Sequence, residues 1–314
     1  MSSLLTNTSA MTALQTLTQT NKSLAESQNR IATGQRVSTA SDNAAYWSIA
    51  TTMRSDNKAL SAVQDALGLG AATIDTMYTA LDSTVDVVSE IKKKLVAART
   101  PGVDRAKIQS EITELQSQLK NTADSAVVNG ENWLSYDSSS ASYNATKSVV
   151  SSFSRAGGVV SIGTIEVDLT KIELYDAADQ TGILDKVMDN NVAGTLTAVS
   201  SGESVADLDI SALTDEAADL AVLEELIGGV DNALNLITDA ATNLGAIKNR
   251  IGLQQDFVKA LVDSLDRGIG QLVDADMNAE STRLQALQTQ QQLGIQALSI
   301  ANSGSQSILS LFRG

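Results

Sequence analysis

The sequence predicts a mainly α-helical protein: an elongated rod of long, antiparallel coiled-coil-like helices with one small β-containing inserted domain. Two heptad-spaced apolar runs, in residues 60–95 and 223–272, support this fold class. A third observation is the uneven charge, because residues 136–225 hold 16 acidic and 4 basic residues and so carry −12 of the net −15. A segment so acidic indicates a solvated surface between the two helical halves.

The first predicted helix occupies residues 1–33. Its apolar residues alternate at spacings of three and four, which places them on one narrow stripe. The rest of its surface is Ser, Thr, Asn and Gln, with charge only at Lys22, Glu26 and Arg30. The stripe residues that we expect to form a self-assembly seam are Leu14, Leu17, Leu24 and Ile31.

An extended link interrupts the helical rhythm after residue 33. Turn and N-cap residues cluster here, and a new helix is predicted to begin near Asn43 or Ala44. Tyr46 and Trp47 are expected to anchor the start of that helix by burial. We assign the link between an inner and an outer helical domain to Gly34, Arg36, Asp42, Asn43 and Trp47.

Residues 60–95 give the strongest periodic signal. Eleven positions keep one heptad frame and nine of them are apolar, which predicts a helix that spans ~54 Å. Pro101 ends it. The eleven positions are Leu60, Val63, Leu67, Gly70, Ile74, Met77, Leu81, Thr84, Val88, Ile91 and Leu95.

The middle of the chain is less regular. A shorter helix is predicted around residues 108–119, and Asn129-Gly130 marks a turn after it. The Ser-rich segment 135–155 is expected to be a loop or a strand edge. The β-branched run after Gly157-Gly158 predicts one or two strands.

From about residue 215 a second long helix is predicted, with thirteen of fifteen heptad positions apolar and a length of ~75 Å. Gly228-Gly229 is expected to kink it or delay its start. A last helix follows in 274–314, with a nearly uncharged surface. Its seam comprises Leu284, Leu287, Gln291, Leu298 and Ile308, and Leu311 belongs to a second apolar set beside it.

The two terminal segments are poorly suited to being free surface helices. Helices with such polar surfaces are marginal alone. We therefore expect both to be disordered in the monomer and to fold, in a parallel or antiparallel pairing, against the termini of neighbouring copies. The predicted domains are a terminal core (1–43 and 274–314), a helical rod (44–135 and 220–273) and a surface-exposed acidic insert (136–219).

Composition excludes several functions. The chain has no Cys and no His, so a Ser-His-Asp triad, a Cys-His nucleophile and an ordinary zinc site are excluded, and no cofactor is expected. Its acidity argues against nucleic-acid binding, and no apolar run is long enough to insert into a membrane. The N-terminus lacks a conventional secretory signal, so composition alone predicts a cytoplasmic protein.

Two short motifs are weak. The stretch Asp274-x-Asp276-x-Asn278 begins like a calcium loop, but Ala279 and Gln285 replace the required Gly and Glu, so no metal site is expected. Gly68-x-Gly70 lies inside a predicted helix and indicates close helix packing, not a phosphate loop.

The ends of the chain resemble bacterial flagellins. The run RIATGQRVSTASDNAA from Arg30 is similar to the family's N-terminal signature. The tail, with DAD at 274–276, Gln290-Gln291, Ala301-Asn302 and LSLFR at 309–313, is similar to its C-terminus. The chain looks like flagellins of soil or plant-associated alphaproteobacteria.

The resemblance implies a secreted, extracellular filament subunit used for swimming motility, exported unfolded by the flagellar type III apparatus. Implied partners are further copies of the chain, other co-assembling flagellins, an export chaperone, a filament cap and hook-associated junction proteins. Family members sensed by a vertebrate receptor carry Arg-x-Arg-Glu-Leu where this chain has a Lys-rich run, so recognition is expected to be lost; the positions concerned are Ile91, Lys93, Lys94 and Leu95.

Two alternatives stay open. A hook–filament junction protein has similar ends. An enzyme housed in the acidic insert is the remote alternative, because no carboxylate pair there has a spacing or an apolar setting that is expected to shift its pKa.

Overall fold

The computed structural model describes residues 7–140, 143–192, 195–198 and 202–311, and it describes no side chains in 190–198 or beyond 304. It divides the chain into two compact units. The terminal unit comprises residues 1–58 and 262–314, and the larger unit comprises residues 59–261. Two long helices, α2 (Ala44–Ala98) and α4 (Ala217–Val273), contribute residues to both units.

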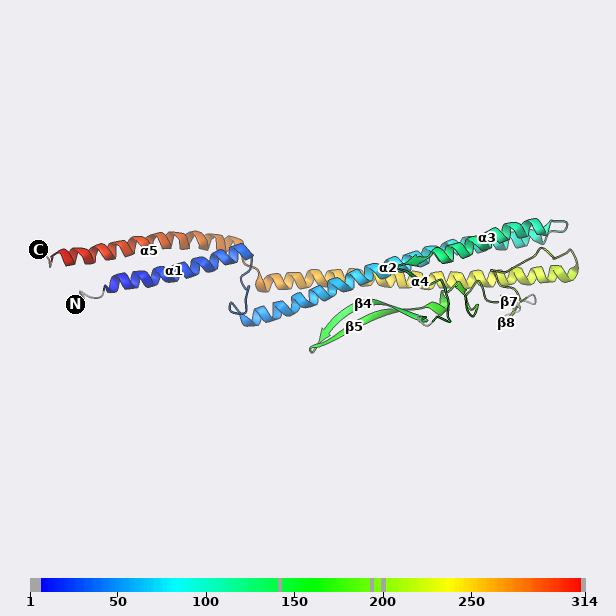
Figure 1. Ribbon diagram of the computed structural model, residues 1–314, viewed down its shortest axis with the longest axis horizontal. Helices are drawn as coiled ribbons and strands as arrows, with labels where there is room; N and C mark the ends of the chain where they lie inside the picture. Colours follow the sequence, from blue (N-terminus) through cyan, green and yellow to red (C-terminus); the bar gives the residue numbers. More distant parts are fainter. Residues whose placement is uncertain (1–6, 141–142, 193–194, 199–201, 312–314) are drawn as a thin grey trace. The chain divides into compact units, whose positions relative to one another are not determined.

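The terminal unit is built around α1 (Thr8–Thr33) and α5 (Met277–Leu311), which lie side by side (Figure 1). Asn7 caps α1, and its Oδ1 accepts a hydrogen bond from the Ala10 amide at 3.0 Å. Gly34 ends α1 in the left-handed region at φ 69°. Asn7 bonds to the Ala301 carbonyl and Gln291 bonds to Asn21, so the two helices run antiparallel.

Short backbone contacts join the two halves of the terminal unit. The Arg36 amide donates to the Val273 carbonyl at 2.6 Å, and the Ala275 amide donates to the Gly34 carbonyl at 2.9 Å. Beside these bonds, a small apolar cluster fixes the start of α2 against the end of α4. It consists of Ala50, Ile269 and Val273, with Met53 and Leu272 packed against it.

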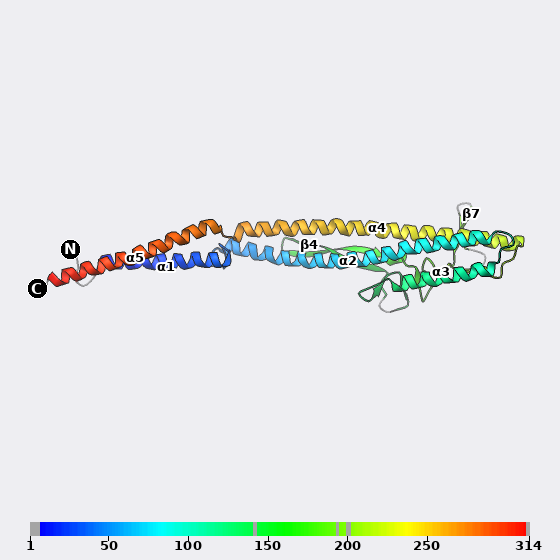
Figure 2. The same cartoon turned by 90° about the horizontal axis from the view of Figure 1, so that it is seen from above.

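In the larger unit, α2 and α4 form a long antiparallel pair (Figure 2). Ion pairs join Asp75 to Lys248 and Lys92 to Asp231, so partners move forward along α2 as they move back along α4. The predicted heptad frame is the buried face of α2, because all eleven positions from Leu60 to Leu95 are buried. Gly70 lies in that face. The sequence predicted that another helix packs against it, but strand β4 (Thr146–Ala156) does, since a Cβ on Gly70 would overlap the Val149 side chain.

The third helix, α3 (Arg105–Ser125), begins after the turn at Pro101-Gly102 and lies along α2. Asp104 caps its first turn. The Arg105 side chain is buried, and it donates to the carbonyls of Ala98 and Leu213 and to the Asp215 carboxylate. This buried guanidinium ties α3 to the end of α2 and to the segment before α4.

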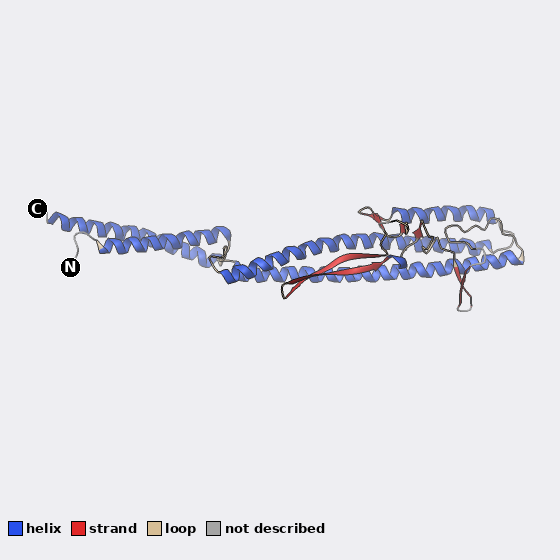
Figure 3. Ribbon diagram, turned by 60° about the horizontal axis from the view of Figure 1, so that its bottom comes forward, coloured by secondary structure: helices blue, strands red, loops and turns tan. Residues whose placement is uncertain are grey.

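Short strands lie within the insert and in the residues just before it, shown in red in Figure 3. A tight hairpin joins β1 (Val127–Val128) to β2 (Glu131–Asn132), and Asn129-Gly130 form its turn with φ values of 53° and 81°. The longest strands, β4 (Thr146–Ala156) and β5 (Val159–Asp168), form an antiparallel hairpin that turns at Gly157-Gly158.

The remaining strands are minor elements. Strand β3 (Ser135–Tyr136) pairs in parallel with β6 (Tyr175–Asp176), after the 3-10 turn η1 (Leu169–Lys171). Strand β7 (Asp189–Val192) pairs with β8 (Thr195–Ala198) in antiparallel orientation.

The structure confirms the mainly helical fold with a small β-containing insert and corrects two local expectations. Residues 146–156 of the Ser-rich segment form a full strand, because their alternate residues pack inward on the hairpin. Gly228-Gly229 does not delay the second long helix, which begins at Ala217, since heptad positions Leu223 and Val230 on either side of the glycines are buried.

Candidate self-assembly surface

The seam predicted at the two termini faces the partner helix but is only half covered. Among its described side chains, Leu14 is 54% exposed. Those that are partly buried are Leu17, Leu24, Ile31, Leu284, Leu287, Gln291 and Leu298. Ile308 and Leu311 lie within α5, but their side chains are outside the described residues.

The fully buried side chains of this pair are polar. In the described parts of α1 and α5 they are Thr20, Ser27 and Glu280. Ser27 and Arg30 both donate to the Glu280 carboxylate, at 2.5 and 3.0 Å. A hydrogen bond from Ser27, and then one from Arg30, hold the pKa of Glu280 below its usual range.

The same helices also expose large apolar side chains at positions outside the seam. They are Met11 on α1 and Leu293, Ile295 and Ile300 on α5, between 55% and 71% exposed. A helix pair that buries polar groups and exposes large apolar ones has its hydrophobic surface on the outside, where another protein can cover it.

The link between α1 and α2 is held by a single carboxylate. Asp42 accepts hydrogen bonds from the amides of Thr39 and Ser38, at 2.8 and 3.0 Å, and from both hydroxyls. The amide bonds, with Thr39 first, hold the pKa of the Asp42 carboxyl below its usual range. Asn43 then caps α2, since its Oδ1 accepts from the Tyr46 amide.

The predicted burial of Tyr46 and Trp47 is wrong for the single chain, because their side chains are 41% and 37% exposed. The guanidinium of Arg36 lies over the Tyr46 ring instead, 6.0 Å from its centroid. On this part of α2 it is Ala50 that packs against Ile269 and Val273 of α4, in the small cluster.

The positions that correspond to the receptor-sensed pattern lie on two sides of α2. Ile91 and Leu95 are fully buried in the heptad face, whereas Lys93 is exposed. Lys94 bonds to Glu111 of α3 at 2.5 Å, and this bond raises the pKa of its ammonium. Only the two lysines therefore present side chains that another protein could contact.

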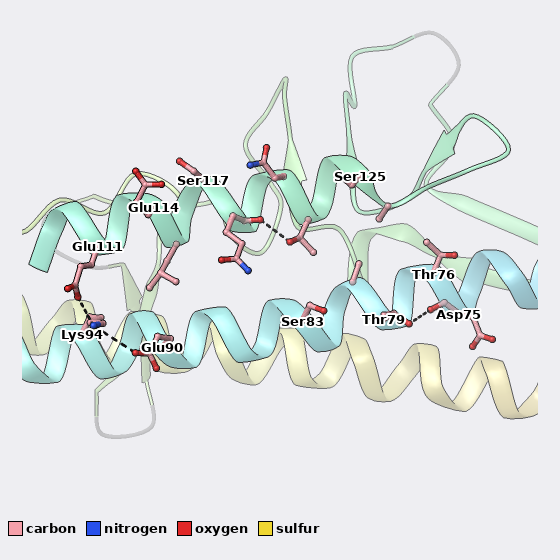
Figure 4. A pocket seen from close by; sticks show the side chains of 16 residues that line it. Asp75, Thr76, Thr79, Ser83, Glu90, Lys94, Glu111, Glu114, Ser117 and Ser125 are labelled. Atoms are coloured by element: carbon pink, nitrogen blue, oxygen red, sulfur yellow. Dashed lines mark hydrogen bonds and ion pairs between the residues drawn. The ribbon is translucent and has the colours of Figure 1, made fainter.

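A groove of about 1190 Å³ runs between α2 and α3 (Figure 4). Its lining has one basic residue, Lys94, and four acidic ones, Asp75, Glu90, Glu111 and Glu114. The other lining side chains are mainly Ser, Thr, Asn and Gln, with Ala80, Leu115 and Ala126 as apolar contacts. Such a polar, open groove lacks the apolar enclosure of a small-molecule site.

The insert does contain two buried carboxylates, which corrects the expectation that none has an apolar setting. Burial raises the pKa of Glu173, and Asp176 and Asp185 add to that rise. Burial alone also raises the pKa of Asp176, but hydrogen bonds from Ser138, Ala178 and Thr181 bring it to about 2. Thr181 donates to both carboxylates and Tyr136 donates to Glu173, so the pair is held inside a hydrogen-bonded network.

Two further kinds of feature are absent from the described residues, a metal site and a membrane-spanning helix. No three or more acidic residues there are placed to hold a metal ion. No described helix is both long and apolar enough to cross a bilayer. Paired terminal helices with exposed apolar side chains, and a long helical pair that carries an insert, are typical of structural subunits that assemble with further copies of themselves.

Comparison with known proteins gives the family. The profile described as "Bacterial flagellin N-terminal helical region" matches residues 4–139, and "Bacterial flagellin C-terminal helical region" matches residues 227–312. The chain belongs to the bacterial flagellin family. It is 52% identical to flagellin C of Rhizobium meliloti (strain 1021) and 46% identical to a flagellin of Brucella melitensis, and each match covers 100% of both chains.

The protein is thus a structural subunit of the helical flagellar filament, outside the cell, and its curated relatives are alphaproteobacterial flagellins. A solved structure of a putative flagellar hook-associated protein from Vibrio parahaemolyticus has the same fold, with a TM-score of 0.52 and 16% identity. That match covers 74% of this chain and 100% of the other. At this identity the likeness concerns the fold alone, and it does not favour a junction protein over a flagellin.

The sequence analysis missed the buried polar contact between the termini. Thr20 and Ser27 are seven residues apart and lie beside the leucine stripe, which is a heptad signal in its own right. Glu280 is the one acidic residue in the first turn of α5. A search for polar residues in heptad spacing, and not only for apolar ones, would have found the α1 side of this contact.

Proposed function

We propose that filament assembly proceeds through the terminal seam and the apolar stripe beside it. One observation carries the proposal: the described part of the α1–α5 pair buries Thr20, Ser27 and Glu280 and exposes Met11, Leu293, Ile295 and Ile300. Neighbouring copies that cover these exposed side chains remove apolar surface from water, which the single chain cannot do.

In this proposal the chain has three parts. Residues 1–43 and 274–314 form an inner core, residues 44–135 and 220–273 form an outer helical layer, and residues 136–219 face outward as the acidic insert. The link at Gly34, Arg36, Asp42, Asn43 and Trp47 connects the two layers. Trp47 and Tyr46, exposed in one chain, then have a second copy to pack against.

The proposed partners follow from the same role. Besides further copies and co-assembling flagellins, they are an export chaperone, a filament cap and hook-associated junction proteins. We propose no catalytic activity. The buried Glu173 and Asp176 are engaged by Tyr136, Thr181 and Ser138, which gives them a structural role in the insert.

Deletion of either terminal segment tests the assembly surface. Variants that lack residues 1–43 or residues 274–314 should form no filaments in electron micrographs after salt-induced polymerisation. Both should keep the unfolding transition of the larger unit, reported by the fluorescence of the buried Trp133. Filaments of normal length from either variant would disprove the proposal, whereas loss of the Trp133 transition would show that the termini stabilise the larger unit directly.

We also propose that a vertebrate flagellin receptor does not recognise the α2 face around Lys93 and Lys94. Glu111 occupies Lys94 by an ion pair, and Ile91 and Leu95 are buried. In a receptor reporter assay, monomer should give at most about a hundredth of the response of a recognised flagellin. Restoring the accessible part of the pattern with Lys93→Arg and Lys94→Glu should raise the response, and a strong response from the unaltered chain would contradict the proposal.

A further inference from the structure

The terminal helices face a problem of specificity. Their seams repeat Leu, Ala and Gln at heptad spacing, so a shift by seven residues restores a similar set of apolar contacts. In a filament each α1 also meets the α5 helices of neighbouring copies. Half-exposed leucines discriminate weakly between these partners, because apolar contacts are non-directional and many registers bury a similar area.

Glu280 is the buried ionisable side chain in the described part of this pair. It is 9% exposed, and Ser27 opposite it is 2% exposed. One carboxylate oxygen accepts from the Ser27 hydroxyl and the other from Arg30. Arg30 is held in turn by Glu26 at 2.5 Å, and Arg283 approaches Glu280 from its own helix at 3.9 Å.

We propose that Glu280, held by Ser27 and Arg30, is the specificity-determining residue that keeps α1 paired with α5 of its own chain and in this register. A buried carboxylate that loses its donors costs far more than a displaced leucine. A slip by one heptad places Glu280 either level with Thr20 and Ser23 or beyond the end of α1 at Gly34. In both positions it loses the guanidinium of Arg30.

Backbone bonds of Gly34 with Ala275 and of Arg36 with Val273 hold the link beside this contact, and the other side-chain contacts between α1 and α5 are less selective for register. The bond between Gln291 and Asn21 is neutral and exposed, so water replaces it after a slip. Asn7 bonds to a backbone carbonyl, which recurs at every residue of α5. The hydrogen bonds from Ser27 and Arg30 favour the charged form of the carboxyl, which lowers the pKa of Glu280.

A disulfide reporter can measure this pairing, because the chain has no cysteine of its own. A Cβ built on Gly294 lies 3.9 Å from the Leu17 Cβ, which is a distance that suits a disulfide. The full-length double variant Leu17→Cys, Gly294→Cys, polymerised and then oxidised, should give mainly an intrachain product on denaturing gels. A second reporter, Leu17→Cys with Leu287→Cys, forms the intrachain bond only after a slip by one heptad.

The test compares Glu280→Gln and Ser27→Ala with the matched control Glu26→Gln. The control removes the exposed partner of Arg30 and leaves Glu280 in place. Glu280→Gln keeps an acceptor for Ser27 and removes the charge. We expect it to raise the ratio of interchain or slipped product to in-register product about tenfold, which is ~1.4 kcal/mol. Ser27→Ala should raise it less, and Glu26→Gln should leave it unchanged.

Charge reversal supplies the decisive result. In the Glu26→Gln background, Arg30→Glu or Glu280→Arg alone should disrupt the in-register product, and the two together should restore it. An unchanged ratio in Glu280→Gln, or no restoration in the double reversal, overturns the inference. The inference rests on the proposed assembly surface. If a chain that lacks residues 1–43 or 274–314 still forms filaments, the assembly surface is at fault; if the reporter polymerises and the ratios do not respond, only the role of Glu280 is.

Discussion

The terminal pair α1–α5 and the larger unit's portion of α2–α4 show how similar heptad patterns give different helix pairs. In the larger unit the frame from Leu60 to Leu95 is buried throughout, with Leu67, Ile74, Met77 and Leu81 fully inaccessible. In the terminal pair the corresponding leucines are half exposed, and the buried side chains described there are polar. The heptad sets the direction of an apolar stripe, but neighbouring elements determine how far it is covered.

The difference follows from what packs on each pair. Elements of the larger unit add a third layer on α2: α3 reaches Lys94 through Glu111, and β4 reaches Gly70 through Val149. In the described part of the terminal pair, α1 and α5 cover only each other and leave Leu14 and Ile300 in solvent. The larger unit is therefore stabilised by contacts within one chain. The apolar side chains left exposed on the terminal pair can be covered only by other copies.

The largest expected effect on stability comes from a matched pair of side-chain truncations, Leu81→Ala and Leu17→Ala. Leu81 is fully buried, so its loss should destabilise the larger unit by ~2–5 kcal/mol. Leu17 is half-buried, so the same change should alter monomer stability by less than ~1 kcal/mol. It should nevertheless raise the protein concentration needed for filament growth.

The two tryptophans separate these effects. Trp133 is buried in the larger unit and Trp47 is 37% exposed in the terminal unit, so urea titrations of Trp47→Phe and Trp133→Phe backgrounds follow one unit each. Sedimentation of polymerised samples gives the critical concentration. If both truncations destabilised the monomer equally, the contrast between the two pairs would be lost.

The sequence predicted the larger unit's main pair well because its signal is strong and repetitive. Eleven heptad positions in one frame can be buried in only one way on a helix, and all eleven are. Helix ends were equally legible: Asn43 caps α2, and Gly34 ends α1. The leucines of the terminal seam are partly buried on both helices, apart from the exposed Leu14, and their role in self-assembly stays a prediction.

Other features depend on tertiary contacts that periodicity does not encode. The antiparallel direction of α1 and α5 is set by backbone bonds between Gly34 and Ala275 and between Arg36 and Val273. Tyr46 and Trp47 are aromatic, yet one chain offers nothing that buries them. The buried carboxylates Glu173 and Asp176 come together only when β6 pairs with β3.

A glycine pair sharpens the comparison at the next level of effect. A Cβ on Gly70 overlaps the Val149 side chain, so Gly70→Ala should destabilise the larger unit by ~1–3 kcal/mol through overpacking. The higher helix propensity of Ala offsets ~1 kcal/mol of that loss. A Cβ on Gly294 meets Leu17 Cδ1 at 3.2 Å, at the end of a flexible, half-exposed side chain. Gly294→Ala should therefore be neutral or stabilising by up to ~1 kcal/mol.

Urea midpoints in the Trp47→Phe and Trp133→Phe backgrounds measure the two glycine effects separately. Gly245→Ala is the control in the larger unit, because its Cβ would meet Tyr78 at an ordinary 3.6 Å. A Gly70→Ala variant as stable as Gly245→Ala would show that the β4–β5 hairpin is not held against α2 at this point. The hairpin would then not explain the burial of α2.

The smallest expected effect is at Gln291, and it appears in filament shape more than in stability. Gln291 donates to Asn21 at 2.8 Å in a seam whose other assigned members are Leu and Ile. A neutral, exposed hydrogen bond is worth ~0.5–1.5 kcal/mol at most and exchanges easily with water, so neighbouring packing states remain close in energy. Gln291→Leu replaces this adjustable contact with a fixed apolar one and should add less than ~1 kcal/mol to the pair.

That small gain is nevertheless repeated in every subunit, so a difference too small to see in one chain can lock the state of a polymer. We expect Gln291→Leu filaments to be straight or fixed in one helical form, and Asn21→Ala, which breaks the same bond without adding apolar surface, to keep the native pitch and its response to pH and salt. Dark-field microscopy of both variants distinguishes the cases. If Gln291→Leu filaments kept native pitch and switching, the half-covered seam would not determine the packing state. The exposed apolar side chains Leu293, Ile295 and Ile300 would then be the described part of α5 that selects it.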